Sequence, residues 1–267
     1  MGCDIHLWVE QREADGKWHR VVTVPEPYRD PWLVKSAAEH KRGTPMSGYY
    51  RLGTLRRWFD DRNYTAFGIL AGVRSSEFPT IAEPRGWPED LSDDLRKLFK
   101  AAENWEEPDE SNLEEQVRRQ IWKADRRKLS YEDWLLDQGY RIPEGDVSPG
   151  DHSESWLTLK ELLDYDWEGP SYMQGTLDWD TWATREKNGG QVGLPDSWCG
   201  WTSAPTVTEA EARKLLKSGK HDKPYVQARW KVLPREAAGG LYTRLIPALQ
   251  SLGGDPEDIR IVFNFDS

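Results

Sequence analysis

Cysteine is almost absent from this sequence: Cys3 and Cys199 are the only two among 267 residues. Two cysteines are too few for a disulfide framework, and these two do not form a CxxC pair. The sequence also lacks an apolar run long enough to span a membrane, and its N-terminal end has neither the basic nor the apolar region of a signal peptide. We therefore expect a cytoplasmic protein of a reducing compartment, without membrane contact.

Positive charge and aliphatic side chains are also scarce. The 36 basic residues are outnumbered by 46 acidic ones, and the net charge is -10. This excess opposes the counterion release that drives non-specific binding to duplex nucleic acid, so a duplex is disfavoured as a partner. Only 37% of the residues are hydrophobic, yet 15 residues are tryptophan. The core must therefore depend on aromatic rings, and rings left at the surface are candidates for stacking, although packing is their commoner role.

Motifs of the well-known enzyme classes are missing. The sequence has no Walker loop, no GxGxxG after a strand, no HExxH, no GxSxG and no EF-hand loop. Asp4, Ile5 and His6 have the spacing that opens metallophosphoesterases, but the later GD and GNH blocks of those enzymes are absent. The run from Gly150 to His152 resembles these later blocks only weakly. The motifs alone leave open whether the protein is an enzyme.

The first ten residues carry the clearest pattern in the chain. They alternate from Cys3 onward with the period of two that is typical of a strand. Asp4 and His6 point to the same side of such a strand with Cβ atoms about 7 Å apart, close enough to share a metal, a proton or a phosphate. The apolar side of the strand holds Cys3, Ile5, Leu7 and Val9, and the other side holds Asp4, His6, Trp8 and Glu10.

Further elements follow from periodicity and capping signals. Asp15 and Gly16 indicate a hairpin turn into a second strand, and two more strands alternate cleanly near the end of the chain. Asn63 is a plausible cap of a short buried helix, and Thr158 and Thr208 begin capping boxes. The predicted strands are 17–24, 225–232 and 259–266, and the predicted helices are 62–74, 92–102, 111–124, 130–139, 158–165, 208–218 and 241–252.

This pattern predicts an α+β fold with a mainly antiparallel sheet. We expect a single domain over 1–267, with a sheet core from 1–24 and 206–267 and a long helical and aromatic-loop insertion over 25–205. The polar face of the sheet becomes a site only if the insertion covers it. If the terminal strands share the sheet, that face collects Asp4, His6, Glu10, Arg229, Arg260, Asn264 and Asp266.

The segment 143–156 is predicted to be a loop, because glycine, proline, serine and aspartate punctuate it. It carries His152 and Ser153 just before a capped helix, where an anion is favoured. We predict that this loop forms one wall of the pocket that contains His6. The alternative is that His152 and Ser153 only brace the turn into the following helix.

The candidate site residues fall into three groups. A solvated or internally hydrogen-bonded strand face is the alternative for Asp4 and His6, and an exposed loop residue or a helix-entry hydrogen bond is the alternative for His152. Pairing with carboxylates is the alternative for the arginines, and Cys3 is expected to be an inert buried thiol. Asp4, His6 and His152 are the candidate catalytic residues, with Asp266 as a further ligand if a divalent metal is bound. The candidate ligand-binding residues are Arg62, Asn63, Arg85, Ser153 and Asn264.

Five blocks of the sequence resemble a family of proteins encoded largely by bacteriophages and prophages. Together they cover about a fifth of the chain. The resemblance implies a phage accessory protein acting in the cytosol of a host cell, and it assigns no role to any residue. The blocks are MGCDIH at 1–6, RNYTAFGILAGVR at 62–74, PRGWPEDLS at 84–92, HSESWLTLKEL at 152–162 and IRIVFNFD at 259–266.

Three functions are compatible with these observations. The first is a polar pocket for a nucleotide-like or phosphate-bearing small molecule, with aromatic rings for stacking and arginine for phosphate, as in evasion of host defence by sequestering a signal. The second is a metal-dependent hydrolase of a phosphoester or related bond. The third is an acidic protein that inhibits a host factor, ranked last because a charge of -10 is diffuse over this length.

Overall fold

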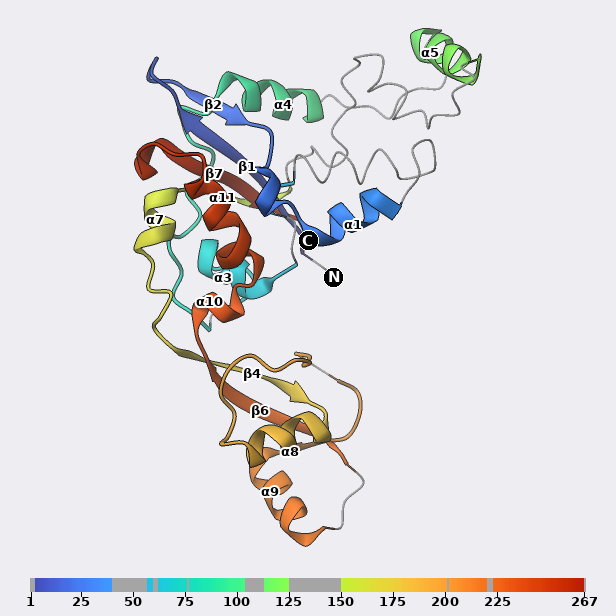
Figure 1. Ribbon diagram of the computed structural model, residues 1–267, viewed down its shortest axis with the longest axis vertical. Helices are drawn as coiled ribbons and strands as arrows, with labels where there is room; N and C mark the ends of the chain where they lie inside the picture. Colours follow the sequence, from blue (N-terminus) through green and yellow to red (C-terminus); the bar gives the residue numbers. More distant parts are fainter. Residues whose placement is uncertain are drawn as a thin grey trace. The chain divides into compact units, whose positions relative to one another are not determined.

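The computed structural model describes residues 3–39, 57–59, 62–75, 77–103, 113–124, 150–200, 202–219 and 223–266 (Figure 1). The chain has the predicted α+β fold and divides into two compact units. Unit 1 comprises 1–62, 82–164 and 243–267, and unit 2 comprises 63–81 and 165–242. That these two units fold together as a single domain stays a prediction.

Unit 1 is built on a four-stranded antiparallel sheet with the strand order β2-β1-β7-β3. The central pair joins the two ends of the chain, and His6 lies directly opposite Asn264. This confirms the prediction that the terminal strands share a sheet. The strands are β1 (Ile5–Arg12), β2 (Trp18–Val21), β3 (His152–Thr158) and β7 (Ile259–Phe265).

Strand β3 corrects the predicted loop over 143–156, of which 143–149 lie outside the described residues. Its register with β7 shifts between His152 and Ser155, and Ser153 has a positive φ of 57°. This irregularity is a β-bulge, which adds a residue to one strand and disturbs its alternation. The sequence therefore shows no period of two at this point. Because its turn-forming residues favour a loop, a loop was predicted here instead of a strand.

Helices cover both faces of the unit 1 sheet (Figure 1). Helix α4 (Asp93–Glu103) packs on the face that carries Trp8, where Leu91, Leu95 and Phe99 complete a buried cluster with Val262. Helices α7 (Leu159–Asp164) and α11 (Ile246–Gln250) lie on the other side. That side holds the fully apolar core of the sheet: Ile5, Leu7, Val9, Ile261, Phe263 and Phe265.

Unit 2 contains a second sheet with the order β4-β6-β5. Its strands are β4 (Ser171–Leu177), β5 (Thr206–Thr208) and β6 (Tyr225–Val232). Strand β6 was correctly predicted as a strand but wrongly placed in the terminal sheet, so Arg229 does not belong to the face of His6. Alternation fixes the sides of a strand and not its neighbours, which explains the error.

Helix ends confirm several capping predictions. The side chain of Asn63 accepts a hydrogen bond from the Ala66 amide at the start of α3 (Tyr64–Ala71). Thr158 and Glu161 form their reciprocal bonds before α7, and a capping box at Thr208 begins α9 (Glu209–Ser218). These signals are local in sequence, and the structure keeps them because each satisfies backbone N–H groups that the helix cannot.

The predicted helix 241–252 is divided. A π-helix, η2 (Leu241–Leu245), precedes α11, and Pro247 occupies the first turn of α11. Proline lacks the N–H that a continuous helix would need there, so the helix restarts at the one place where proline is tolerated.

The remaining elements fall largely in segments where no regular structure was predicted. Proline and glycine interrupt the periodic pattern of these segments. For this reason α1 and η1 in 25–61 and β4 and α8 in 166–205 were not predicted. The predicted helix 130–139 lies outside the described residues. Among the described residues, no helix has the length and apolar character needed to cross a membrane. The remaining elements are η1 (Glu26–Tyr28), α1 (Pro31–Glu39), α5 (Leu113–Ala124), α8 (Trp179–Lys187), α10 (Pro234–Ala237) and η3 (Pro256–Asp258).

Candidate functional site

The pairing of β1 with β7 brings Asp4, His6 and Asp266 together at one end of the sheet. Asp266 accepts a hydrogen bond from the Asp4 backbone N–H (2.8 Å) and lies 3.2 Å from Nε2 of the buried His6. The guanidinium of Arg62 donates to both carboxylate oxygens of Asp4, at 2.6 Å for Nη2. Three of the predicted residues therefore converge with Arg62, which pairs with a carboxylate as in the alternative role considered for it.

The acidity of Asp266 reflects these contacts. Burial opposes ionisation of the group, but hydrogen bonds from the Asp4 amide and the His6 ring, with the charges of His6 and Arg62, hold its pKa below the ordinary value of 3.8. The folded state therefore favours the ionised carboxylate. Its contribution to stability is fully present above the unfolded pKa, and it is lost as the pH falls through the lower, folded pKa.

The substitution Asp266→Asn is accordingly expected to destabilise the protein near neutral pH and to destabilise it much less in acid. The variant should melt below the wild type near neutral pH, and the difference should shrink as the pH falls from about 5 to about 2, where the wild-type carboxylate is protonated. Thermal unfolding followed by circular dichroism measures this. Glu13→Gln, which removes a charge at an exposed position, is the control, and a constant Asp266→Asn difference across this range would contradict the assignment.

His152 is not part of this cluster. It pairs with Phe265 in the β3–β7 register, and its ring stacks near the Phe265 ring with centroids 6.0 Å apart. Phe265 faces the apolar side of the sheet, opposite to His6, so the predicted shared pocket of His6 and His152 is wrong. His152 Nδ1 and Ser153 Oγ lie 2.9 Å apart within the bulge. Both residues therefore brace the bulge at the start of β3 rather than the turn into the following helix, because the rest of β3 separates them from α7.

The predicted metal set is not assembled. His152 is separated from Asp4, His6 and Asp266 by the sheet, and hydrogen bonds already hold both of these carboxylates. In the described part of the chain, no group of three or more histidine, cysteine, aspartate or glutamate side chains is arranged to hold a metal ion. Separation by the sheet follows from the bulge, which the sequence did not reveal.

The other candidate ligand-binding residues have structural partners. Asn63 belongs to unit 2, where it caps α3 and donates to the Ala237 carbonyl (2.8 Å). Asn264 is fully buried and donates to the Gly150 carbonyl (2.7 Å). Arg85 forms a two-pronged ion pair with Glu161 at 2.6 and 3.2 Å. Arg85 also lines a pocket.

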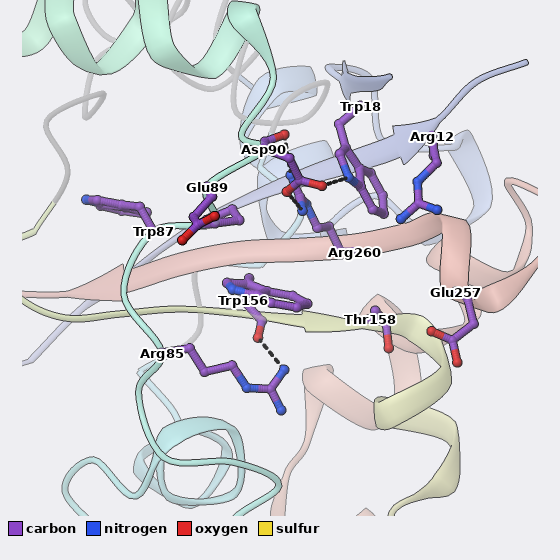
Figure 2. Close-up of a pocket in the computed structure, with 11 residues that line it drawn as sticks. Arg12, Trp18, Arg85, Trp87, Glu89, Asp90, Trp156, Thr158, Glu257 and Arg260 are labelled. Carbon is purple, nitrogen blue, oxygen red and sulfur yellow. Dashed lines mark hydrogen bonds and ion pairs between the residues drawn. The ribbon is translucent and has the colours of Figure 1, made fainter. Parts of the chain in front are cut away.

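That pocket lies on the same sheet face as His6, with Arg12 six residues further along β1 in its lining, and has a volume of about 500 Å³ (Figure 2). Strands β1, β2, β3 and β7 supply one wall, and the segment 85–90 supplies another. This segment is fixed to β3, since the Gly86 amide donates to the Glu154 carbonyl (2.8 Å). The lining residues are Arg12, Trp18, Arg85, Trp87, Pro88, Glu89, Asp90, Trp156, Thr158, Glu257 and Arg260.

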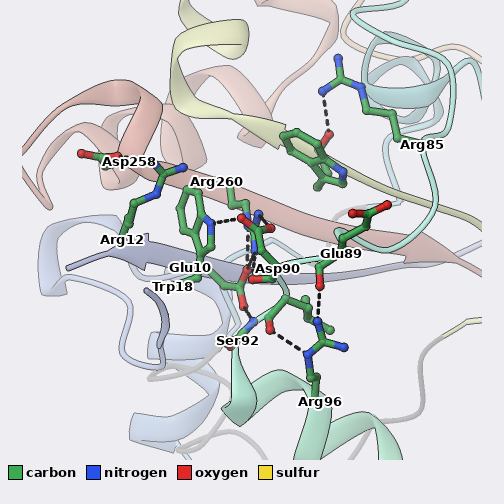
Figure 3. Close-up of polar contacts among 12 residues, drawn as sticks. Glu10, Arg12, Trp18, Arg85, Glu89, Asp90, Ser92, Arg96, Asp258 and Arg260 are labelled. Carbon is green, nitrogen blue, oxygen red and sulfur yellow. Dashed lines mark hydrogen bonds and ion pairs between the residues drawn. The ribbon is translucent and has the colours of Figure 1, made fainter. Parts of the chain in front are cut away.

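An ion-pair network forms the floor of the pocket, with Arg260 and Glu10 buried and Asp90 largely exposed (Figure 3). Arg260, only 2% exposed, donates to the fully buried Glu10 (2.7 Å) and to the Asp90 carboxylate (2.6 Å). The other Glu10 oxygen accepts from the Ser92 amide at 2.9 Å. Burial opposes ionisation of Asp90, but its bonds from Arg260 and Trp18 lower its pKa below 3.8. The network therefore favours the ionised form of the Asp90 carboxylate.

Tryptophan and arginine alternate around the pocket. Trp18 donates to Asp90 (2.8 Å) and lies between two guanidiniums, with Arg260 3.9 Å and Arg12 4.6 Å from its ring centroid (Figures 2 and 3). Arg85 lies 5.0 Å from the ring centroid of Trp156. These cation–π contacts fix the ring planes, so the aromatic walls are preformed.

Sequence reasoning found only part of this site. Glu10 and Arg260 were placed on the polar face, and Arg85 was a candidate, but Trp18, Trp156 and Asp90 were assigned no role. The surplus of tryptophan was the available signal. It gave no positions, because the pocket combines residues from four segments far apart in the sequence.

Comparisons with known proteins give no further guide. The chain matches no protein-family model, no curated protein and no solved structure. The resemblance to a phage-encoded family stays a prediction, and the site has to be interpreted from its own chemistry.

Proposed function

We propose that unit 1 binds a nucleotide-like small molecule with a flat ring and little negative charge in the tryptophan–arginine pocket. The supporting observation is a preformed pocket of about 500 Å³ lined by three tryptophans and three arginines. This volume lies within the range of ligand sites, and aromatic walls with a few polar groups are their usual lining. A phage accessory protein with such a pocket would act by sequestering a host molecule.

The tryptophan rings differ in their access to a ligand. Trp18 is buried, with 6% of its surface exposed, and it already contacts two guanidiniums. Trp87 and Trp156 are partly exposed and line the pocket. Stacking of a base on an aromatic side chain contributes about 1–3 kcal/mol. Trp156 and Trp87 are therefore the stacking surfaces, and Trp18 belongs to the floor.

Charge limits the ligand more narrowly than shape does. Each of the three lining arginines is paired with a carboxylate: Arg12 with Asp258, Arg85 with Glu161, and Arg260 with Glu10 and Asp90. Glu89 and Glu257 also line the pocket, and neither forms an ion pair with a described residue. A triphosphate would meet these two carboxylates. The pocket therefore suits a nucleoside or a nucleoside monophosphate.

Arg12 is the guanidinium best placed for a single phosphate. Its ion pair with Asp258 joins side chains that are 42% and 39% exposed, and such surface pairs contribute little. Arg12 can therefore exchange Asp258 for a phosphate at low cost. Arg260 cannot, because all of its donor groups face Glu10 and Asp90.

Calorimetric titration with ribonucleosides and their mono- and triphosphates tests the proposal. Monophosphates should bind most tightly and triphosphates more weakly. Trp156→Ala should weaken all of these ligands, by about 5- to 150-fold, because it removes a stacking surface. Arg12→Gln should weaken monophosphates and leave nucleosides unaffected.

Arg213→Gln is the matched control, since it removes an exposed, glutamate-paired arginine in unit 2. Tighter binding of triphosphates, or no binding of any of these compounds, would refute the proposal. The two other predicted functions have no such support. The described residues form no metal-binding group that a hydrolase would need, and an acidic inhibitor of a host factor stays a prediction.

A further inference from the structure

The sheet of unit 2 has one buried face and one largely exposed face, and on the latter Thr176 is buried. Strand β6 alternates strictly, with the side chains of Val226, Ala228, Trp230 and Val232 buried and those between them exposed. Helices α8 and α9 contact β6, and α9 also contacts β5. The exposed side chains belong to Tyr172 and Gln174 of β4, Thr206 and Thr208 of β5, and Tyr225, Gln227, Arg229 and Lys231 of β6.

The composition of this exposed face differs from that of the chain. Its eight exposed side chains include two tyrosines, one arginine and one lysine, and none of the eight is acidic. The whole chain carries 46 acidic residues and a net charge of -10. The face is therefore a local surface of charge +2 on an acidic protein, and it attracts an anionic partner.

The register places the rings and the cations side by side. Tyr172 lies opposite Lys231, and the Arg229 guanidinium lies 4.3 Å from the Tyr172 ring centroid. Tyr225 lies six residues from Lys231 along β6, about 20 Å at the rise of a strand. The tyrosines are 50% and 38% exposed. Two accessible rings thus lie at the two ends of the face, with Arg229 between them and Lys231 beside Tyr172.

We propose that this face binds single-stranded nucleic acid. Unpaired bases stack on Tyr172 and Tyr225, Arg229 and Lys231 contact phosphates, and the Gln174 and Gln227 amides bond base edges. A duplex hides the faces of its bases, so it cannot use the tyrosine rings, in agreement with the acidity of the chain. An acidic peptide would satisfy the cations but would leave both rings without a stacking partner.

Fluorescence anisotropy of the full chain with labelled single-stranded RNA and DNA of mixed sequence tests this proposal. Tyr172→Ala and Tyr225→Ala should each weaken binding about 5- to 150-fold. Two phosphate contacts predict a slope of log K against log salt of about -1.4, and Arg229→Gln should reduce its magnitude by about 0.7. All three side chains are exposed, so thermal unfolding should be nearly unchanged in each variant.

Two controls separate this face from the rest of the chain. Lys214→Gln removes an exposed charge on α9 and should leave affinity unchanged. Trp156→Ala should also leave it unchanged, and a loss there would assign the binding to the unit 1 pocket and overturn the proposal. Equal affinity for duplex and single strand would overturn the proposal as well, and so would the absence of measurable binding. It would also be overturned if a poly-glutamate peptide competed equally well in the wild type and in both tyrosine variants.

Discussion

Arg260→Met is expected to lower the free energy of unfolding by about 3–5 kcal/mol. The substitution keeps a long side chain but removes the one cation among the described residues that contacts Glu10, which is fully buried. Glu10 would then keep one hydrogen bond, from the Ser92 amide, and its charge would have no counterion. Removing one partner of a buried pair costs far more than the pair itself contributes, because the remaining charge is not solvated. Urea denaturation followed by circular dichroism measures the loss.

A double variant separates this cause from lost packing. Glu10→Leu with Arg260→Met removes both charges, and apolar replacements of a buried pair are often neutral, so most of the stability should return. Arg235→Gln, which breaks an exposed pair with Glu168 in unit 2, should cost less than about 1 kcal/mol. An Arg260→Met variant as stable as Arg235→Gln would show that the network does not stabilise unit 1.

Trp230→Ala is expected to cost a similar amount, about 3–5 kcal/mol, in unit 2. Trp230 is fully buried, and its ring packs against Trp198 with centroids 5.5 Å apart. Gly175 lies opposite Ala228 on the neighbouring strand, and a Cβ there would lie 3.0 Å from the Trp230 ring and 2.8 Å from Trp198. The two rings occupy the space that this glycine leaves, so alanine at position 230 would create a cavity between the strand and Trp198.

Trp230→Phe supplies a matched comparison. The indole Nε1 of Trp230 is buried and has no hydrogen-bond partner among the described residues, so phenylalanine removes an unsatisfied donor while it keeps most of the ring. Its cost should be well below that of alanine. Urea denaturation of both variants measures the difference, and an equal loss in the two would contradict the assignment of the alanine cost to lost ring volume.

The sequence by itself determined the local features of this protein. The alternation of β1 and β7 gave the correct faces for Asp4, His6 and Asp266, because a period of two leaves only two sides for each side chain. Capping residues marked the starts of α3, α7 and α9, because each cap satisfies backbone groups within three residues of itself. The acidic composition and the scarcity of cysteine were likewise properties of the sequence alone.

Only the tertiary structure decided which strands are neighbours. Strand β6 alternates as cleanly as β7, yet it pairs with β4 and β5. Strand β3 joins β7 through a bulge that puts His152 on the side away from His6. The pocket depends on this arrangement, since its rings and guanidiniums come from β1, β2, β3, β7 and the segment 85–90. Strand pairing depends on contacts between residues far apart in the chain, and a local pattern carries no record of them.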